Sequence, residues 1–312
     1  MHALLYIARR AGQIGITVIL VAVLSFTLMR MLPGDPAVVL LGDRATDAMI
    51  ARLHHQMGLD QPVIVQFWRY LVNLATLNLG DSLIMRIPVS TLLLQRLPVT
   101  LGLTCYAIVL SLVISVPLAL AAALREGGIA DTTIQVGGQI GLSVPTFYLG
   151  LILLITLAAG LGWFPVGGIG NGFLDNLYVL FLPALTLALS TASLLMRNIR
   201  AALVDVLQAE FVSFARAKGI PRRLLLLRHV LRNAAASTLT LVGVQVAGLV
   251  GGAVITETVF AIPDLGQLMI NSIFSRDYAV VQGALVVIAV MISVVFLLTD
   301  ALQAMLDPRV DA

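Results

Sequence analysis

Long stretches without a charged residue dominate this chain of 312 residues. A helix needs about 20 consecutive apolar residues to cross the hydrocarbon core of a bilayer. The uncharged runs of about that length are Ala11–Met29, Val99–Leu124, Asn176–Met196, Asn233–Thr256 and Tyr278–Thr299. A further helix is expected within Thr132–Leu174, ending near Leu161 before a glycine-rich stretch. The sequence therefore predicts an all-α integral membrane protein with about six transmembrane helices.

We assign residues 1–312 to one domain. The spans are expected at 10–31, 98–124, 132–161, 177–197, 234–257 and 278–305. A long helical insertion, 32–97, follows the first span, and a polar loop, 203–233, joins the fourth to the fifth. In the insertion, Thr46 can cap a helix that Gly58 ends, and Pro62 can start another. Ser90–Leu97 is expected as a short helix on the membrane surface, because Pro98 suits the start of the second span.

Composition agrees with a membrane protein. The chain is 59% hydrophobic and 11% charged, with a mean hydropathy of +1.01, which no ordinary soluble domain reaches. The net charge is only +3, and the sequence has no basic stripe interleaved with aromatic residues. Nucleic-acid binding is therefore not expected. The single cysteine, Cys105, excludes an intrachain disulfide and is expected as a small core residue.

The distribution of basic residues predicts the orientation. One set of loops holds Arg9, Arg10, Arg125, Arg309 and the basic residues of 197–232. The opposite short loops hold Arg276 alone. Lys and Arg concentrate in the cytoplasmic loops of membrane proteins. Both termini and the 203–233 loop are therefore expected in the cytoplasm, and the 32–97 insertion outside it.

The 203–233 loop reads as a helix, a glycine corner and a second helix. Leu207, Phe211 and Phe214 recur at i, i+4 and i+7 and predict one apolar face of a short helix that starts near Asp205. Gly219 suits the residue just past the helix end, because glycine accepts a positive φ. Pro221 can begin the next helix. An apolar face on a polar loop indicates a docking surface.

Specific strings in this loop carry a family resemblance. Ala215–Gly219 reads A-R-A-K-G and Arg228–Asn233 reads R-H-V-L-R-N. They resemble the cytoplasmic coupling loop of ABC-importer permeases, in the branch that imports dipeptides, oligopeptides, glutathione or nickel. Further strings of that branch occur in the same order, including Leu32–Pro36, Gly162–Gly168 and Glu257–Phe260. The resemblance runs from Arg9 to Arg309.

The resemblance implies a permease subunit in the bacterial cytoplasmic (inner) membrane. Implied partners are a second, homologous permease in a heterodimer, two cytoplasmic ATPase subunits, an extracytoplasmic binding protein and membrane lipid. The implied substrate is a short peptide, with glutathione, a nickel chelate or another small solute open. ATP and magnesium would bind the ATPase subunits, and this chain would need no cofactor. The implied coupling residues are Leu207, Glu210, Phe211, Phe214, Ala215, Arg216, Ala217, Lys218 and Gly219.

Enzymatic motifs are missing from the sequence. A P-loop needs a lysine directly after a glycine, and the only lysine, Lys218, precedes its glycine. No histidine is followed by glutamate, as an H-E-x-x-H zinc protease requires. His54 and His55 could suggest a metal site, but neighbouring helical side chains diverge by about 100°. We expect neither ATP hydrolysis nor a metal site on this chain.

Polar uncharged residues recur at the expected membrane depth: Ser111, Ser115, Gln139, Ser143, Thr186, Ser190 and Gln245. They predict either hydrogen bonds between helices or the lining of a wet passage. Gly248, Gly251 and Gly252 predict close helix packing. Charges stand only at span ends, at Arg30, Glu257 and Asp300, which disfavours the alternative of an ion-coupled secondary carrier. A purely structural scaffold would leave the helix–glycine–helix loop unexplained.

Overall fold

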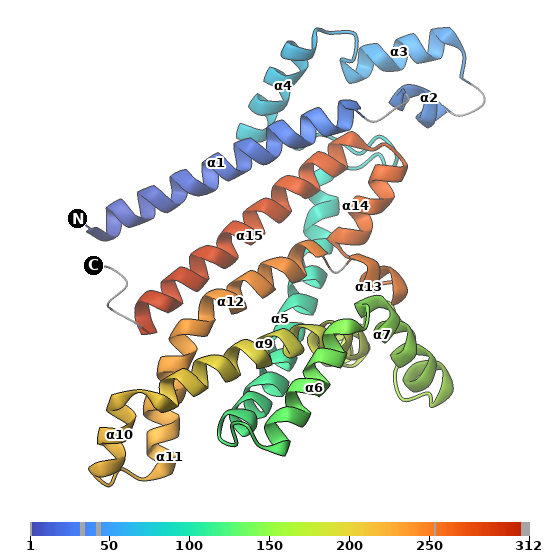
Figure 1. Ribbon diagram of the computed structural model, residues 1–312. Coiled ribbons are helices and arrows are strands. Elements are labelled where there is room, and N and C mark those ends of the chain that lie inside the picture. Colours follow the sequence, from blue (N-terminus) through green and yellow to red (C-terminus); the bar gives the residue numbers. More distant parts are fainter. Residues whose placement is uncertain (1, 32–34, 42–44, 253, 307–312) are drawn as a thin grey trace. The chain divides into compact units, whose positions relative to one another are not determined.

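The computed structural model describes residues 2–31, 35–41, 45–252 and 254–306 (Figure 1). These ranges are helical with turns and loops, and they contain no strand beyond an isolated bridge between Asp81 and Pro88. The expected all-α class is confirmed. The chain divides into two compact units. Unit 1 comprises Met1–Thr100 with Pro263–Ser293, and unit 2 comprises Leu101–Ile262 with Val294–Ala312.

Unit 1 holds the first span and the insertion that follows it. Its helices are α1 (His2–Met31), α2 (Pro36–Leu41), α3 (Asp47–Met57), α4 (Val63–Ala75), α14 (Leu265–Phe274) and the first parts of α5 (Val89–Ala123) and α15 (Tyr278–Leu306). The Thr46 side chain caps α3 by accepting a hydrogen bond from the Met49 amide. Gly58 ends this helix at φ 66°. Both expected helix signals are confirmed.

The start of α5 corrects one expectation. In place of a separate surface helix at Ser90–Leu97, α5 runs unbroken from Val89 through Pro98 to Ala123. Val89, Leu92 and Leu93 are buried, and Val89 packs so closely on α15 that an added Cβ at Gly283 would lie 2.9 Å from its side chain. Membrane helices tolerate an internal proline because neighbouring groups satisfy the freed carbonyl. Packing therefore outweighs the proline signal.

Unit 2 holds the remaining helices. They are α6 (Ile129–Ser143), α7 (Thr146–Leu153), a π-helical continuation at Leu154–Gly160, α8 (Phe173–Val179), α9 (Phe181–Gln208), α10 (Glu210–Ala217), α11 (Arg222–Leu224), a π-helical stretch at Leu225–Val230, α12 (Leu231–Gly252) and α13 (Val254–Val259). The later parts of α5 and α15 also belong to this unit.

The expected third span is not one straight helix. The axes of Ile129–Ser143 and Thr146–Gly160 differ by 96° across the break at Val144 and Pro145. The residue before a proline is disfavoured in the helical region, and Val144 has an extended conformation, with φ −83° and ψ 125°. Among the described residues, four helices are long and apolar enough to span a membrane, and up to six spans result if this pair and the bent pair around α12 each count once.

The fourth span also differs from the expectation of a helix at 177–197 and a new one near Asp205. Helix α9 continues through both positions and ends at Gln208. Its inner face is buried along most of its length, including Leu182, Leu195 and Leu203. Because burial continues past Arg197, nothing interrupts the helix there. The break falls instead at Ala209, whose extended conformation separates α9 from α10.

Two smaller expectations are wrong. Cys105, expected in the core, is exposed on unit 2. Gly248, expected at a close helix contact, has no atom within 4 Å of an added Cβ. The close contacts of unit 2 lie at other glycines, such as Gly141 against Ser193 and Gly243 against Thr299. Glycine spacing alone did not identify which helix faces meet.

Candidate functional site

Helix α10 packs one face against the rest of unit 2 and exposes another. On the inner face Val212 is fully buried, and it joins a core cluster with Leu203, Leu225 and Val230. On the outer face the side chains of Phe211 and Phe214 are 43% and 68% exposed. The two rings stand three residues apart and therefore share one side of the helix. The packing of α10 thus holds two large apolar side chains away from the protein's own core.

Leu207 does not belong to this outer face. It lies in α9, before the break at Ala209, and packs against the core cluster. The expected face of Leu207, Phe211 and Phe214 assumed one uninterrupted helix. The break gives α10 a direction different from that of α9, so Leu207 contacts the core cluster while the two phenylalanines remain exposed.

The corner after α10 has the geometry of a Schellman motif. The Gly219 amide donates to the Arg216 carbonyl at 2.9 Å, and the Ile220 amide donates to the Ala215 carbonyl at 3.2 Å. Gly219 has φ 74°, as the sequence predicted. Ile220 packs back onto the core cluster, which fixes the direction in which the chain leaves α10. Pro221 precedes the first residue of α11, Arg222.

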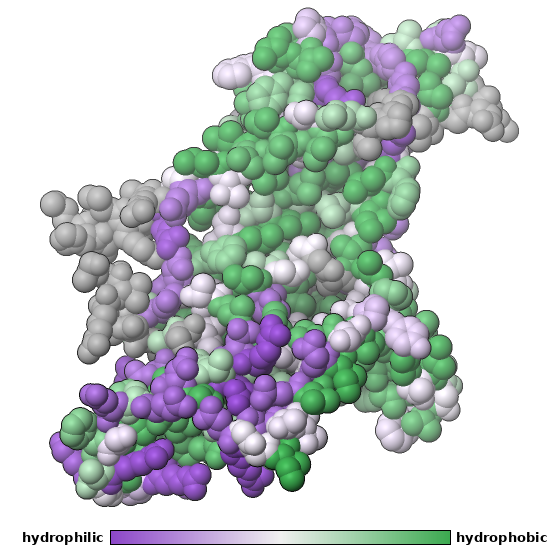
Figure 2. Space-filling model, in the orientation of Figure 1, coloured by the Kyte–Doolittle hydropathy of each residue, from purple (hydrophilic) through white to green (hydrophobic). Residues whose placement is uncertain are grey.

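The other residues assigned to coupling surround the two phenylalanines. Glu210, Arg216, Ala217, Lys218 and Gly219 are exposed, whereas Ala215 packs inward. Hydrophilic residues gather over the end of unit 2 that carries α10 and α11, with apolar residues among them (Figure 2). The arrangement is an apolar centre with a charged rim, which is the usual anatomy of a protein docking surface.

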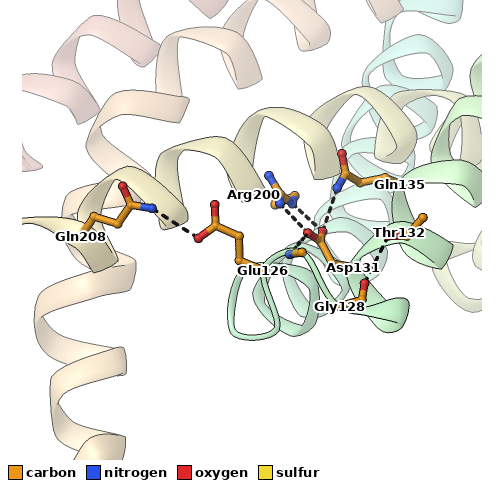
Figure 3. A network of polar contacts seen from close by, with 8 residues as sticks. Glu126, Gly128, Asp131, Thr132, Gln135, Arg200 and Gln208 are labelled. Carbon is orange, nitrogen blue, oxygen red and sulfur yellow. Dashed lines mark hydrogen bonds and ion pairs between the residues drawn. The ribbon is translucent and has the colours of Figure 1, made fainter.

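A buried ion pair, which sequence reasoning missed, holds α9 two turns before this surface (Figure 3). The Arg200 guanidinium donates two hydrogen bonds to the Asp131 carboxylate, at 2.6 and 2.5 Å. Asp131 also accepts from the Gly127 amide and the Gln135 side chain, each at 2.9 Å. Asp131 is 2% exposed. This polar clamp joins the start of α6 to the far part of α9.

A second contact links the same two regions nearer to α10. The Gln208 side chain donates to Glu126 in the α5–α6 loop at 3.3 Å (Figure 3). The sequence signal for these contacts was faint: an acid at the start of one apolar helix, and an arginine just beyond the expected end of another. Nothing in the spacing of Asp131 and Arg200 indicates that they meet.

The residues expected along a passage are scattered in unit 2. Ser111 and Ser115 are fully buried, Gln139 and Ser143 are exposed, and Ser190 and Gln245 are half-buried. Where hydroxyl bonds form, they return to the same helix: Ser111 to Ile108, Ser143 to Gln139 and the buried Thr186 to Leu182. The expectation of bonds between helices is therefore wrong for these three residues. The Ser115 hydroxyl has no partner within the described part of the chain.

One groove of about 240 Å³ lies between α6 and α9. Gln139 lines it, together with Gln135, Ser193 and Arg197. Of the residues expected along a passage, Gln139 alone lines this groove.

The paired histidines of α3 have separate partners. His54 contacts Asp35 at 2.8 Å and His55 contacts Asp60 at 2.8 Å. The hydrogen bond with His55 lowers the pKa of Asp60 below its usual value. The side chains thus diverge as expected for neighbours on a helix. Across the described residues, no three His, Cys, Asp or Glu side chains gather where they could hold a metal ion.

The chain belongs to the family of binding-protein-dependent transport system inner membrane components, which matches residues 115–312. The N-terminal family of the same membrane components matches residues 3–104. The chain is thus a membrane-spanning permease component of an ABC importer.

Particular relatives extend over nearly the whole chain. A putative peptide transport system permease protein of Brucella abortus is 36% identical over 97% of this chain and 98% of its own length. The oligopeptide transport system permease protein AppB of Bacillus subtilis is 36% identical, with 98% and 99% covered. The glutathione transport system permease protein GsiC of Salmonella paratyphi A is 35% identical, with 98% of each covered.

A solved structure shares the fold. The inward-facing MetNI methionine ABC transporter contains a chain that superposes with a TM-score of 0.59, at 18% sequence identity. The likeness covers 69% of this chain and 96% of that chain. At this identity it supports the arrangement of helices only.

Proposed function

We propose that this chain forms part of the translocation path for short peptides and that α10 docks onto a separate ATPase subunit. The observation that carries the proposal is the exposure of Phe211 and Phe214 on a helix whose opposite face is fixed by buried Val212. Glu210, Arg216 and Lys218 form the charged rim of this surface. A docked ATPase would cover the two rings and move α10 with it, which changes access to the path.

The assembly we propose contains this chain, a second homologous permease, two ATPase subunits and an extracytoplasmic binding protein. The cluster of Arg and Lys in 197–232 supports a cytoplasmic position for α10 and for both termini. ATP and magnesium bind the ATPase subunits, because this chain lacks a lysine placed to contact nucleotide phosphates.

The proposed substrate class rests on relatives. Two of them are named for peptide or oligopeptide transport, and a third for transport of glutathione. A short peptide is the first candidate, and glutathione or another small solute is the second. Mass spectrometry of the ligand that copurifies with the binding protein decides between them. Exclusive recovery of a non-peptide solute would contradict the peptide assignment.

The docking role is tested with Phe211→Ala and Phe214→Ala in the complete transporter. Each removes an aromatic anchor, and an interface hot spot of this kind contributes about 2 kcal/mol or more, roughly a 30-fold loss of affinity. We expect the ATPase subunits to dissociate from the purified complex and transport to fall. The amount of folded permease should not change, because both rings are outside the core.

Two matched variants separate docking from folding. Val212→Ala leaves the outer face intact but removes buried apolar volume, which costs about 2 kcal/mol and should reduce folded permease. Ser213→Ala changes an exposed neighbour and should alter neither the retention of the ATPase subunits nor the amount of folded permease. Normal ATPase retention in both phenylalanine variants, or a loss of folded protein instead, would reject the docking role.

A further inference from the structure

Helix α4 in unit 1 carries an apolar stripe that no described residue covers. Ile64, Trp68 and Val72 are 71%, 68% and 45% exposed. They occupy positions i, i+4 and i+8, which lie within about 80° of one another around a helix. The opposite side carries Gln66, Arg69 and Asn73. The helix is thus amphipathic, with its apolar side turned away from the protein.

A third flank of α4 packs on α1. The Phe67 and Tyr70 rings lie 5.0 and 5.8 Å from the Phe26 ring, centroid to centroid. The Tyr70 hydroxyl lies 3.4 Å from the Ser25 hydroxyl. These contacts fix α4 beside α1 in unit 1 (Figure 1).

The contact with α1 sets the depth of α4 in the bilayer. Gly12–Met31 is apolar and long enough to span a membrane. Phe26 stands five residues before its end, which is about 7.5 Å along the helix axis. Interfacial helices bury their apolar face about 5–10 Å into the boundary between headgroups and acyl chains. The stripe of α4 therefore lies at the level where such helices bind lipid.

A charged side chain also indicates that this part of α4 lies at the membrane interface. The Arg30 guanidinium lies over the Phe26 ring, 3.7 Å from its centroid, and donates to the Gln66 side chain of α4. Arginines at span ends place their charge at the interface. Trp68 also fits this level, because tryptophan is enriched in the aromatic belts of membrane proteins.

We propose that α4 is an interfacial helix, whose stripe of Ile64, Trp68 and Val72 binds the acyl chains of the leaflet at the outer end of α1. The insertion is thereby held against the bilayer beside the first span. Docking of a protein on the stripe is the competing outcome.

The test uses Trp68 as a reporter in the full chain. The chain has two tryptophans, so Trp163→Phe leaves Trp68 alone. This change keeps the contact of Trp163, because its backbone carbonyl accepts the hydrogen bond from Tyr178. The variant is reconstituted into phosphatidylcholine vesicles whose acyl chains are brominated near the headgroup or near the methyl end. Trp163→Leu serves as a second background if the first lowers the yield.

We expect Trp68 fluorescence to fall in brominated vesicles, more strongly with bromine near the headgroup, and to resist iodide added to the water. A matched control carries Arg69→Trp, at an exposed position, with Trp68→Phe and Trp163→Phe. Its tryptophan lies on the polar side and should be quenched by iodide but not by bromine. Iodide quenching of Trp68 without bromine quenching would overturn the proposal. Protection of an iodide-accessible Trp68 by added binding protein would assign the stripe to that protein.

Discussion

Arg200 in α9 donates two hydrogen bonds to Asp131 at the start of α6, and both side chains are largely buried. The pair ties together helices that lie 69 positions apart in sequence. Arg200 stands eight residues before Gln208, so the tie is about 12 Å from the end of α9. The polar clamp thereby holds the part of α9 that leads to the break at Ala209 and to α10.

Removing one partner of the clamp should destabilise the protein strongly. Asp131→Ala leaves a buried guanidinium without its carboxylate, which costs about 3–5 kcal/mol. We expect a lower thermal unfolding midpoint in detergent. The double variant Asp131→Leu with Arg200→Met should recover much of the loss, because no charge is then left uncompensated. Equal stability of the parent and Asp131→Ala would show that the pair contributes little.

Gly219 should tolerate no side chain, for a backbone reason. Its φ of 74° is unfavourable for other residues, although an added Cβ would meet no atom within 4 Å. Gly219→Val should therefore cost on the order of 1–2 kcal/mol and redirect the chain after α10. ATPase retention is the readout, with membrane insertion unchanged. Lys218→Ala has an ordinary φ of −76° and should leave stability unchanged. Normal retention of the ATPase subunits by a Gly219→Val transporter would contradict this prediction.

Substitution of Gly167 should destabilise the fold for a steric reason. An added Cβ would overlap the Phe260 carbonyl, which accepts a hydrogen bond from the Gly168 amide. Gly167→Ala must shift backbone and should reduce folded protein. The matched change Gly137→Ala falls in a helix with open space around it and should stabilise by up to about 1 kcal/mol. The thermal unfolding midpoint should fall in Gly167→Ala and rise slightly in Gly137→Ala.

Membrane topology is tested by single-cysteine labelling. Cys105→Ser is required as the background, because Cys105 is exposed in unit 2. Gln56→Cys in α3 and Ser213→Cys in α10 both replace exposed side chains. An impermeant maleimide should label Gln56→Cys from outside intact cells, and Ser213→Cys only after permeabilisation. The reverse pattern would invert the proposed orientation.

The purified chain should hydrolyse no ATP in the presence of magnesium. The physical reason is the lack of a phosphate-binding lysine, since Lys218 is exposed beside α10 and precedes its glycine. Phosphate release is measured after every copurified subunit has been removed. ATP hydrolysis that persists in the isolated chain after every other subunit has been removed would contradict this expectation.

Local signals in the sequence predicted local structure well. Thr46, Gly58 and Gly219 occupy the helix ends that their backbone preferences indicate. The apolar runs predicted the helical class because lipid forces backbone hydrogen bonds to close within each helix. The prolines at Pro62 and Pro221 precede helices as expected, whereas the signal at Pro98 was wrong. Pro98 lies inside α5, whereas Pro145 follows the sharp break between α6 and α7.

The features that the sequence did not predict depend on which helices meet. The contact of Asp131 with Arg200 is invisible without the fold, because neither residue belongs to a spaced motif. The outward direction of Phe211 and Phe214 depends on the break at Ala209, a residue with no propensity to end a helix. The polar residues at depth were found, but most of their hydroxyls bond to their own helices rather than to a neighbour.

The continuity of α9 has a consequence for how far the end next to α10 moves when α9 tilts. Its 28 residues extend about 42 Å at 1.5 Å per residue. With no break between Phe181 and Gln208, a tilt of about 10° around one end sweeps the other through about 7 Å, given that length. A small angular change of α9 is therefore amplified, along one helix, into a displacement of its far end that is wider than a water molecule.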